Sequence, residues 1–226
     1  MPPTPPPPAG VVTLVLASAS PARLATLRAA GVEPMVVVSE VDEDAVVAAA
    51  ADRYGALAPE DIALLLARAK CEAVAAGNQF PGVVLGCDSV LELDGEVHGK
   101  PVDAAEAVAR WRRMRGHTGL LHTGHWLVDD RDDGGGATIG ATASTAVHFA
   151  DLGDEEIEDY VATGEPLRVA GAFTIDGLGG PFVTRIEGDH HNVVGLSLPL
   201  LRDLLNDAGI GWFDLVAPGP PHPGQG

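Results

Sequence analysis

Short apolar runs alternate with stretches of helical periodicity along most of the chain. Val11–Leu16 and Val83–Cys87 are typical of buried strands, whereas residues 59–76 repeat apolar side chains every three or four positions, as a helix does. The same reasoning predicts, in chain order, a strand at 11–16, a helix from 21 to 30, strands at 35–39 and 83–87, a hairpin of 90–93 and 96–98, a helix at 104–114, long strands at 120–128 and 137–149, a helix at 154–163, a strand at 181–186 and a helix at 199–206.

This alternation of helices and strands predicts the α/β class. Asp94-Gly95 favours a two-residue hairpin, and the polar segment 129–136 separates two long strands. Because hairpin strands are antiparallel, we expect a mixed β-sheet flanked by helices. We also expect residues 10–216 to form one domain between a disordered proline-rich arm, 1–9, and a disordered Pro/Gly tail, 217–226.

Charge and composition narrow the classes of function. Lys and Arg number 14 against 32 Asp and Glu, a formal net charge of −18 that repels polyanions, so no nucleic-acid partner is expected. A small basic pocket for one phosphorylated ligand stays compatible with that charge. The sequence has no apolar run of about 20 residues and no secretory signal, which predicts no membrane partner. Cys71 and Cys87 make no disulfide framework, so a cytoplasmic location is expected.

The turn Ser18–Arg23 is the first candidate for chemistry. It leads from a predicted strand into a helix that Ser20 caps and Pro21 begins. Backbone amides and the positive end of the helix dipole meet there, beside two hydroxyls and Arg23, which suits a phosphate. An ordinary helix cap with a surface arginine explains the same residues, and both readings stay open.

Asp88 is the second candidate, since it follows the buried strand 83–87 directly. Catalytic groups of open α/β sheets often lie where such strands end, so Asp88 could be a general base or a metal ligand. A turn-forming aspartate is the alternative. The acidic run 40–44 reads first as a solvated loop, but with Asp88 it could hold a divalent cation. Lys70 and Lys100 are the only lysines of the chain, which weakly favours a specific need for them.

Other polar segments carry less weight. The glycine-rich stretch 171–180 permits close approach of a ligand but has no dinucleotide-binding or P-loop spacing. Arg110, Arg112, Arg113 and Arg115 are expected on a solvated helix face or a subunit contact. His122 and His125 differ by three positions, so they should lie on opposite faces of a strand and make no metal site with His117. His190-His191 is expected in a loop.

Taken together, these segments resemble the Maf family of nucleoside triphosphate pyrophosphatases. The segments that carry the resemblance are 14–23 (LVLASASPAR), 40–43 (EVDE), 67–70 (ARAK), 86–89 (GCDS), 93–96 (LDGE), 99–101 (GKP), 122–124 (HTG), 160–166 (YVATGEP), 177–180 (GLGG), 186–189 (IEGD) and 192–196 (NVVGL). The resemblance implies hydrolysis of a nucleoside triphosphate to the monophosphate and pyrophosphate, with Mg²⁺ or Mn²⁺. It also implies two lobes around a deep cleft, similar to the inosine triphosphatase family, and often a homodimer.

The family's site residues are carried over position by position. Asp88 matches the family's proton acceptor, and Glu43 and Asp88 are the residues expected to hold the metal. The other matches are the basic site residues Lys70 and Lys100 and the phosphate-binding residues Ser18, Ser20 and Arg23. Which carboxylate is base and which is ligand is left open. Housecleaning of non-canonical or modified nucleotides is the expected role.

Three positions depart from the family pattern and resemble its base-selectivity sites. Ala22 stands where many members have a second arginine, Ser89 where many have threonine, and Asp176 where members that prefer thymidine and uridine triphosphates have glutamine. Asp176 accepts hydrogen bonds but cannot donate them, which favours a base edge with N–H donors, such as guanine or a modified purine or cytosine. Two alternatives remain: a nucleotide-binding regulator of cell division with little turnover, and a metal-dependent phosphatase that releases orthophosphate.

Overall fold

A computed structural model describes residues 10–77, 81–132 and 134–217. The expected arm, 1–9, and all but the first residue of the expected tail lie outside these ranges. The elements are β1 (Leu14–Ala17), α1 (Pro21–Ala29), β2 (Met35–Val36), α2 (Glu43–Tyr54), α3 (Pro59–Gly77), β3 (Val83–Leu93), β4 (Glu96–His98), α4 (Ala104–Met114), β5 (Thr118–Asp129), β6 (Thr138–Phe149), α5 (Asp154–Ala162), β7 (Val183–Glu187), α6 (His190–Val194) and α7 (Leu198–Asp207), with 3₁₀ turns at Pro166–Arg168, Ala170–Ala172, Gly180–Phe182 and Trp212–Asp214.

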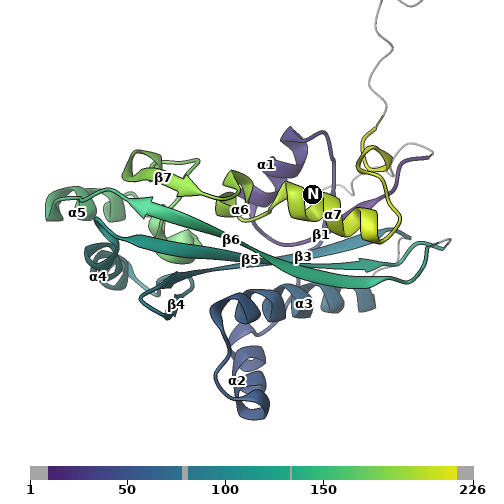
Figure 1. Ribbon diagram of the computed structural model, residues 1–226, viewed down its shortest axis with the longest axis horizontal. Helices are drawn as coiled ribbons and strands as arrows, with labels where there is room; N and C mark the ends of the chain where they lie inside the picture. The colour runs from purple at the N-terminus through teal and green to yellow at the C-terminus, as the bar shows by residue number, and fades with distance from the viewer. Residues whose placement is uncertain (1–9, 78–80, 133, 218–226) are drawn as a thin grey trace, which may run out of the picture.

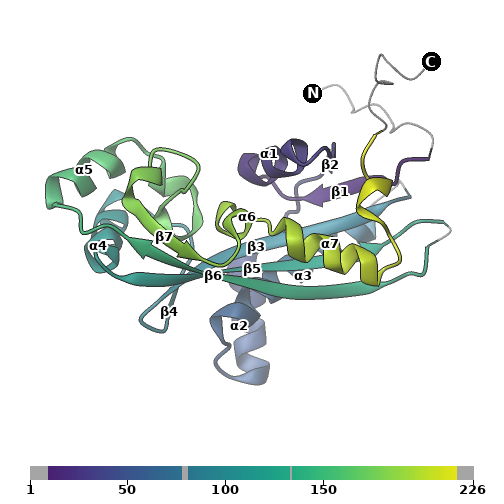
Figure 2. The ribbon, with the colours of Figure 1, turned by 45° about the horizontal axis from the view of Figure 1, so that its top comes forward.

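One mixed sheet organises the molecule and confirms the predicted α/β class. Its strands follow the order β2-β1-β3-β5-β6-β7, and β4 also pairs with β3. The pairs that involve β1 are parallel, and all the other pairs are antiparallel. The long strands β3, β5 and β6 run the length of the molecule, with α3 on one face and α1, α6 and α7 on the other (Figures 1 and 2). None of the helices in the described ranges has the length and apolar character of a membrane span.

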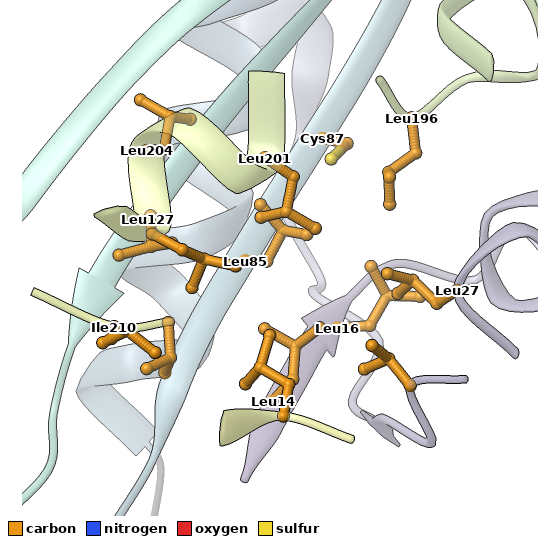
Figure 3. Packing of buried hydrophobic residues seen from close by; sticks show 14 residues of the cluster. Leu14, Leu16, Leu27, Leu85, Cys87, Leu127, Leu196, Leu201, Leu204 and Ile210 are labelled. Carbon is orange, nitrogen blue, oxygen red and sulfur yellow. The ribbon is translucent and has the colours of Figure 1, made fainter. Parts of the chain in front are cut away.

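The first hydrophobic core lies between the sheet and the helices α1 and α7. Leu16 and Leu85 come from the sheet, Leu27 comes from α1 and Leu201 from α7, and all four side chains are fully buried. Figure 3 shows these side chains pointing toward one another across the layer. The alternation of side chains along β3 places Leu85 and Cys87 on this face.

A second core lies toward the other end of the same long strands. Leu91 and Leu93 of β3 pack there with Trp111 of α4 and with Tyr160 of α5. The ring of Trp111 meets that of Tyr160 edge-on, with centroids 5.5 Å apart. The two cores share no residue, and the change from one to the other falls on β3 between Cys87 and Leu91. The expectation of two lobes around a deep cleft stays a prediction.

Helix α3 packs unusually close to the opposite face of the sheet. A Cβ atom at Gly86 would lie 2.2 Å from the carbonyl oxygen of Ala67, and one at Gly124 would lie 2.3 Å from that of Ala63. Only glycine permits this approach at either position. The close packing fixes α3 against β3 and β5, and α3 carries Lys70.

Some local predictions were wrong, for physical reasons. The run 40–44 is a loop only up to Asp42, which caps α2 by accepting the amide of Ala45; Glu43 and Asp44 form the first turn of the helix, where acidic residues favour the N-terminus. His190-His191 begins α6, because Asp189 caps that helix. The predicted strand 35–39 ends at Val36, since β1 ends at Ala17 and offers no further partner.

Strand β3 is longer than predicted, because it joins the two expected strands 83–87 and 90–93 into one. β3 continues without a break from Val83 to Leu93, because β5 pairs with it along nearly its whole length. Polar Asp88 and Ser89 therefore lie within a strand, not at its end. This placement decides the geometry of the candidate site.

Candidate functional site

The candidate site lies at a gap along one edge of β3. On that edge β1 pairs with residues 83–86 and β4 with residues 91–93. Within the described ranges no strand covers residues 87–90 there, although β5 pairs with them on the other edge. Asp88 and Ser89 thus lie in the gap and at the border between the two cores.

Lys70 joins the two predicted carboxylates. Its ammonium nitrogen lies 2.5 Å from Oδ1 of Asp88 and 2.7 Å from Oε1 of Glu43. Glu43 is the first residue of α2, and Lys70 lies in α3, so two helices and a strand meet at this point. Glu43 lies 27 positions before Lys70, and Asp88 lies 18 positions after it. Only the resemblance to the family predicted a common site for these three residues, and the structure brings them together.

Asp88 is only 7% exposed, and its environment alters its acidity. Burial raises the pKa of the Asp88 carboxyl, the nearby cations Lys70 and Arg23 counteract that rise, and Glu43 adds to it; the net direction is upward. A carboxylate with a raised pKa is a stronger base than a solvated one. Glu43 is half-exposed, so the two carboxylates have different environments.

Arg23 is buried and hydrogen-bonds to several segments of the protein, so it is not a surface residue. Its guanidinium donates to the carbonyl oxygens of Gly195 and Cys87, at 2.6 and 2.8 Å, and to the hydroxyls of Ser18 and Ser89, at 3.2 and 3.0 Å. These bonds connect α1 to the gap in β3 and to the end of α6. With most of its donors directed at the protein, Arg23 orders the site, and its contact with phosphate stays a prediction.

The two serines of the first turn also bond within it. Ser20 accepts the amide of Arg23 and caps α1, as predicted, and Ser18 accepts the amide of Ser20. The turn therefore has the compact shape that points the start of a helix at one spot beside the gap. Whether these groups bind phosphate stays a prediction.

Lys100 is exposed and follows β4, and its contact with the site stays a prediction. β4 runs antiparallel to β3, pairing His98 with Leu91, so the chain after His98 heads toward the uncovered residues of β3. The preceding carbonyl, that of Gly99, accepts from Arg110 at 2.6 Å and from the amide of Gly171 at 3.1 Å, which holds this exit in place. Lys70 and Lys100 thus approach the gap from different elements.

Two of the three positions that are predicted to select the base share one groove. Ala22 on α1 and Asp176 on the glycine-rich segment both line a groove of about 350 Å³. Ser89 does not line it but bonds Arg23, one residue from Ala22. The other lining residues are Ala25, Thr26, Ala29, Ala30, His190, His191, Val194 and Leu198.

Sequence reasoning missed the two histidines of this groove. His190 and His191 lie edge-on to each other, with ring centroids 5.5 Å apart, at the start of α6. The Asp189 cap was the signal that could have revealed this short helix. Imidazole rings beside an acidic acceptor suit a planar heterocycle better than a bare phosphate.

The remaining polar candidates lie elsewhere. Arg110 is buried against Gly99, which corrects its predicted solvated position, whereas Arg112, Arg113 and Arg115 pair with carboxylates on the surface. His122 lies between Glu92 and Ser144, and the buried His125 instead accepts the amide of Ser197. The two histidines thus contact different parts of the fold, as their spacing predicted.

A metal would find few ready-made ligands here. In the described ranges no group of three or more His, Cys, Asp and Glu side chains could hold a metal ion. Glu43 and Asp88 nevertheless converge on the single ammonium of Lys70, so two hard oxygen donors face one point. Mg²⁺ is commonly held by one or two carboxylates, with substrate phosphates and water as its other ligands. The donor set fits such an ion bound together with a substrate.

Comparison with known proteins places this site in a family. A relative from Leifsonia xyli subsp. xyli is 57% identical over 205 residues, covering 89% of this chain and 95% of its own. Relatives from Streptomyces coelicolor and Trichormus variabilis are 55% and 48% identical, covering 91% and 85% of this chain and 95% and 92% of their own. All three are named nucleoside triphosphate pyrophosphatase.

A solved structure and a family model complete the comparison. The dITP/XTP pyrophosphatase of Mycobacterium abscessus is 18% identical, with coverage of 62% of this chain and 74% of its own and a TM-score of 0.34, too low to establish a shared fold. The model of the Maf-like protein family matches residues 13–208, which include the Ser18–Arg23 turn, the Lys70–Asp88 pair and the Asp176 segment. From this match and the identities above, the chain belongs to the Maf family.

Proposed function

We propose that this protein hydrolyses nucleoside triphosphates to the nucleoside monophosphate and pyrophosphate. The observation that carries the proposal is the buried Asp88 in the gap of β3, ion-paired with Lys70, which also pairs with Glu43. The names of relatives up to 58% identical support the same reaction. A pure nucleotide-binding protein has no need for a buried base of this kind.

The residues divide the work of the reaction as follows. Asp88 accepts a proton from the water that attacks the α-phosphorus, for which its raised pKa suits it. The new P–O bond forms as the bond from the α-phosphorus to the bridging oxygen breaks, and pyrophosphate leaves. Lys70 stabilises the negative charge that builds up, and Lys100 approaches from the other side of the gap. The turn at Ser18–Arg23 binds phosphate through its amides and hydroxyls.

A divalent cation, Mg²⁺ or Mn²⁺, belongs to this proposal. Glu43, beside Asp88, would hold it together with the substrate's phosphates. When bound, it neutralises phosphate charge and makes the α-phosphorus more electrophilic. The half-exposed Glu43 is better placed as a ligand, and the buried Asp88 as the base.

The groove between α1 and α6 is the proposed site of the base. Ala22 leaves room there, and the acceptor Asp176 favours bases with N–H donors, such as guanine or a modified purine or cytosine. Removal of non-canonical or modified nucleotides is the corresponding cellular role.

We also propose a cytoplasmic location, because Cys71 and Cys87 are both free, as is usual in a reducing compartment. The family resemblance is the basis for proposing a homodimer.

One assay tests the reaction and separates the alternatives. The purified protein is incubated with Mg²⁺ or Mn²⁺ and a panel of triphosphates, methylated ones included, and both pyrophosphate and orthophosphate are measured. We expect pyrophosphate and monophosphate in equal amounts, and no turnover after chelation of the metal. Orthophosphate as the first product would indicate a phosphatase, and binding without turnover would indicate a regulator. Preference for UTP over all the others would refute the role given to Asp176.

A further inference from the structure

We propose that Glu165 is a positioning residue for base selection: its carboxylate holds the segment Thr174–Gly179 in one conformation, and so sets the position of Asp176 in the groove. Glu165 follows α5 in the chain and does not line the groove itself. It acts through the segment that does. The inference rests on the proposed function and goes beyond it, since it names the group that organises the selectivity site.

The carboxylate of Glu165 accepts four hydrogen bonds. Oε1 accepts from the hydroxyl of Thr174 at 2.6 Å, from that of Tyr160 at 2.9 Å and from the amide of Gly179 at 3.1 Å. Oε2 accepts from the amide of Leu178 at 3.0 Å. Three of these donors belong to the segment, one before Asp176 and two after it, so both arms of the loop are tied to one side chain.

Two glycines show how tightly the segment wraps around this carboxylate. A Cβ atom at Gly177 would lie 2.5 Å from Oε2 of Glu165, and one at Gly179 would lie 2.4 Å from the hydroxyl oxygen of Tyr160. Both contacts are shorter than any side chain tolerates. The glycines that the sequence offers for close approach to a ligand are therefore used, at these two positions, for close approach to Glu165 and to its partner Tyr160.

The anchor works only in its ionised form. Burial opposes ionisation of Glu165, but the hydrogen bonds from Thr174, Leu178, Tyr160 and Gly179 outweigh it, and the pKa of the carboxyl is lowered. All four partners are donors, so a group that itself carries hydrogens would face another donor. A glutamine at this position has nearly the same shape, but its NH₂ group replaces one of the two oxygens. The variant should therefore lose the hydrogen bond from the amide of Leu178 or one of the hydrogen bonds that Oε1 accepts.

Fixing Asp176 has a consequence for selectivity. Asp176 is exposed. When an exposed loop binds a ligand, the loss of its conformational entropy reduces the affinity, unless the loop is already held in place. A fixed acceptor discriminates between base edges by geometry, whereas a mobile one accepts several. Asp88 and Lys70 lie on other elements, so loosening the segment should change the binding of the base and leave the chemical step alone.

The test compares Glu165→Gln with Glu72→Gln, which alters an exposed glutamate paired with Arg68 on α3. Hydrogen exchange of the amides of Leu178 and Gly179 is measured first, together with the melting temperature. Steady-state kinetics with GTP and UTP follow. For Glu165→Gln we expect faster exchange, a raised KM for the preferred base, a nearly unchanged kcat, and a ratio of kcat/KM values between the two nucleotides that falls about tenfold. Glu72→Gln should match the wild type.

Two further variants keep the inference falsifiable if Glu165→Gln does not fold. Thr174→Val and Tyr160→Phe each remove one donor and keep the shape of the side chain, so smaller changes in the same direction are expected. Unchanged exchange and selectivity in all three variants, or a loss of kcat at constant KM, would overturn the proposal. If the wild type turns over no triphosphate, the proposed function is wrong, but the role of Glu165 can still be tested. Hydrogen exchange of the Leu178 and Gly179 amides and the affinity for a non-hydrolysable nucleotide then decide it.

Discussion

The ammonium nitrogen of Lys70 lies 2.5 Å from Oδ1 of Asp88, and this contact joins α3 to β3 at the gap along the edge of β3. Both side chains are largely buried, so neither charge is screened as it would be on the surface. The pair also reaches the N-terminus of α2 through Glu43. The contact between Lys70 and the proposed general base thus depends on how closely α3 packs against the sheet.

Replacing Asp88 with Asn should reduce turnover at least about 100-fold, since an amide cannot accept the proton. KM for the triphosphate should change much less. Steady-state assay of pyrophosphate release measures both. Asp129→Asn is the matched control, because Asp129 is also a buried strand aspartate paired with an arginine, far along β5. Near-normal turnover in a folded Asp88→Asn variant would rule out the assignment.

Replacing Arg23 with Lys should destabilise the protein by about 3 kcal/mol, because a lysine cannot serve the four acceptors that the guanidinium serves. Urea unfolding gives this value. Arg28→Lys on the same helix, where Arg28 forms an exposed pair with Glu33, should leave the stability nearly unchanged. A stable Arg23→Lys variant with a raised KM would instead favour direct contact with phosphate.

Replacing Gly86 with Ala should cost about 1–3 kcal/mol and lower turnover as well, because the added Cβ meets the carbonyl oxygen of Ala67 and pushes α3, with Lys70, away from Asp88. Thermal unfolding and the pyrophosphate assay measure the two effects. Gly77→Ala, at the end of α3, meets no atom within 4 Å and should leave both nearly unchanged. Full activity in a destabilised Gly86→Ala variant would separate the packing of α3 from the site.

The buried His125 should make stability depend on pH. Burial lowers the pKa of its imidazole to about 4, from an ordinary value of 6.5, while the imidazole accepts the amide of Ser197 in its neutral form. Below pH 6.5 the unfolded chain takes up a proton that the folded chain refuses, so this contribution to stability is complete above 6.5 and is lost as the pH falls toward 4. The loss should be about 3 kcal/mol.

Urea unfolding at several pH values checks this expectation. The wild type should lose more stability than His125→Gln between pH 7 and pH 4, whatever the starting stability of the variant. Parallel stability curves for the two proteins would show that His125 does not titrate as its burial requires.

Much of the fold followed from local patterns. Local sequence patterns predicted α3, α4 and the long strands β5 and β6 to within a few residues, because the two helices bury one face and polar or glycine-rich turns separate the strands. Hydrophobic periodicity failed for α2, whose weakly amphipathic, alanine-rich sequence is exposed on most of its surface. It also failed for the short α6, which has too few turns to show a period.

By itself, the sequence determined the class of fold, the mixed sheet, the family and the candidate site residues Asp88, Lys70, Glu43 and the Ser18–Arg23 turn. Only the tertiary structure decided what surrounds them. Arg23 bonds a carbonyl 172 residues away, and the Glu165 carboxylate gathers a segment around Asp176. Such contacts depend on packing between distant segments, and packing leaves no period or spacing in the sequence of either partner.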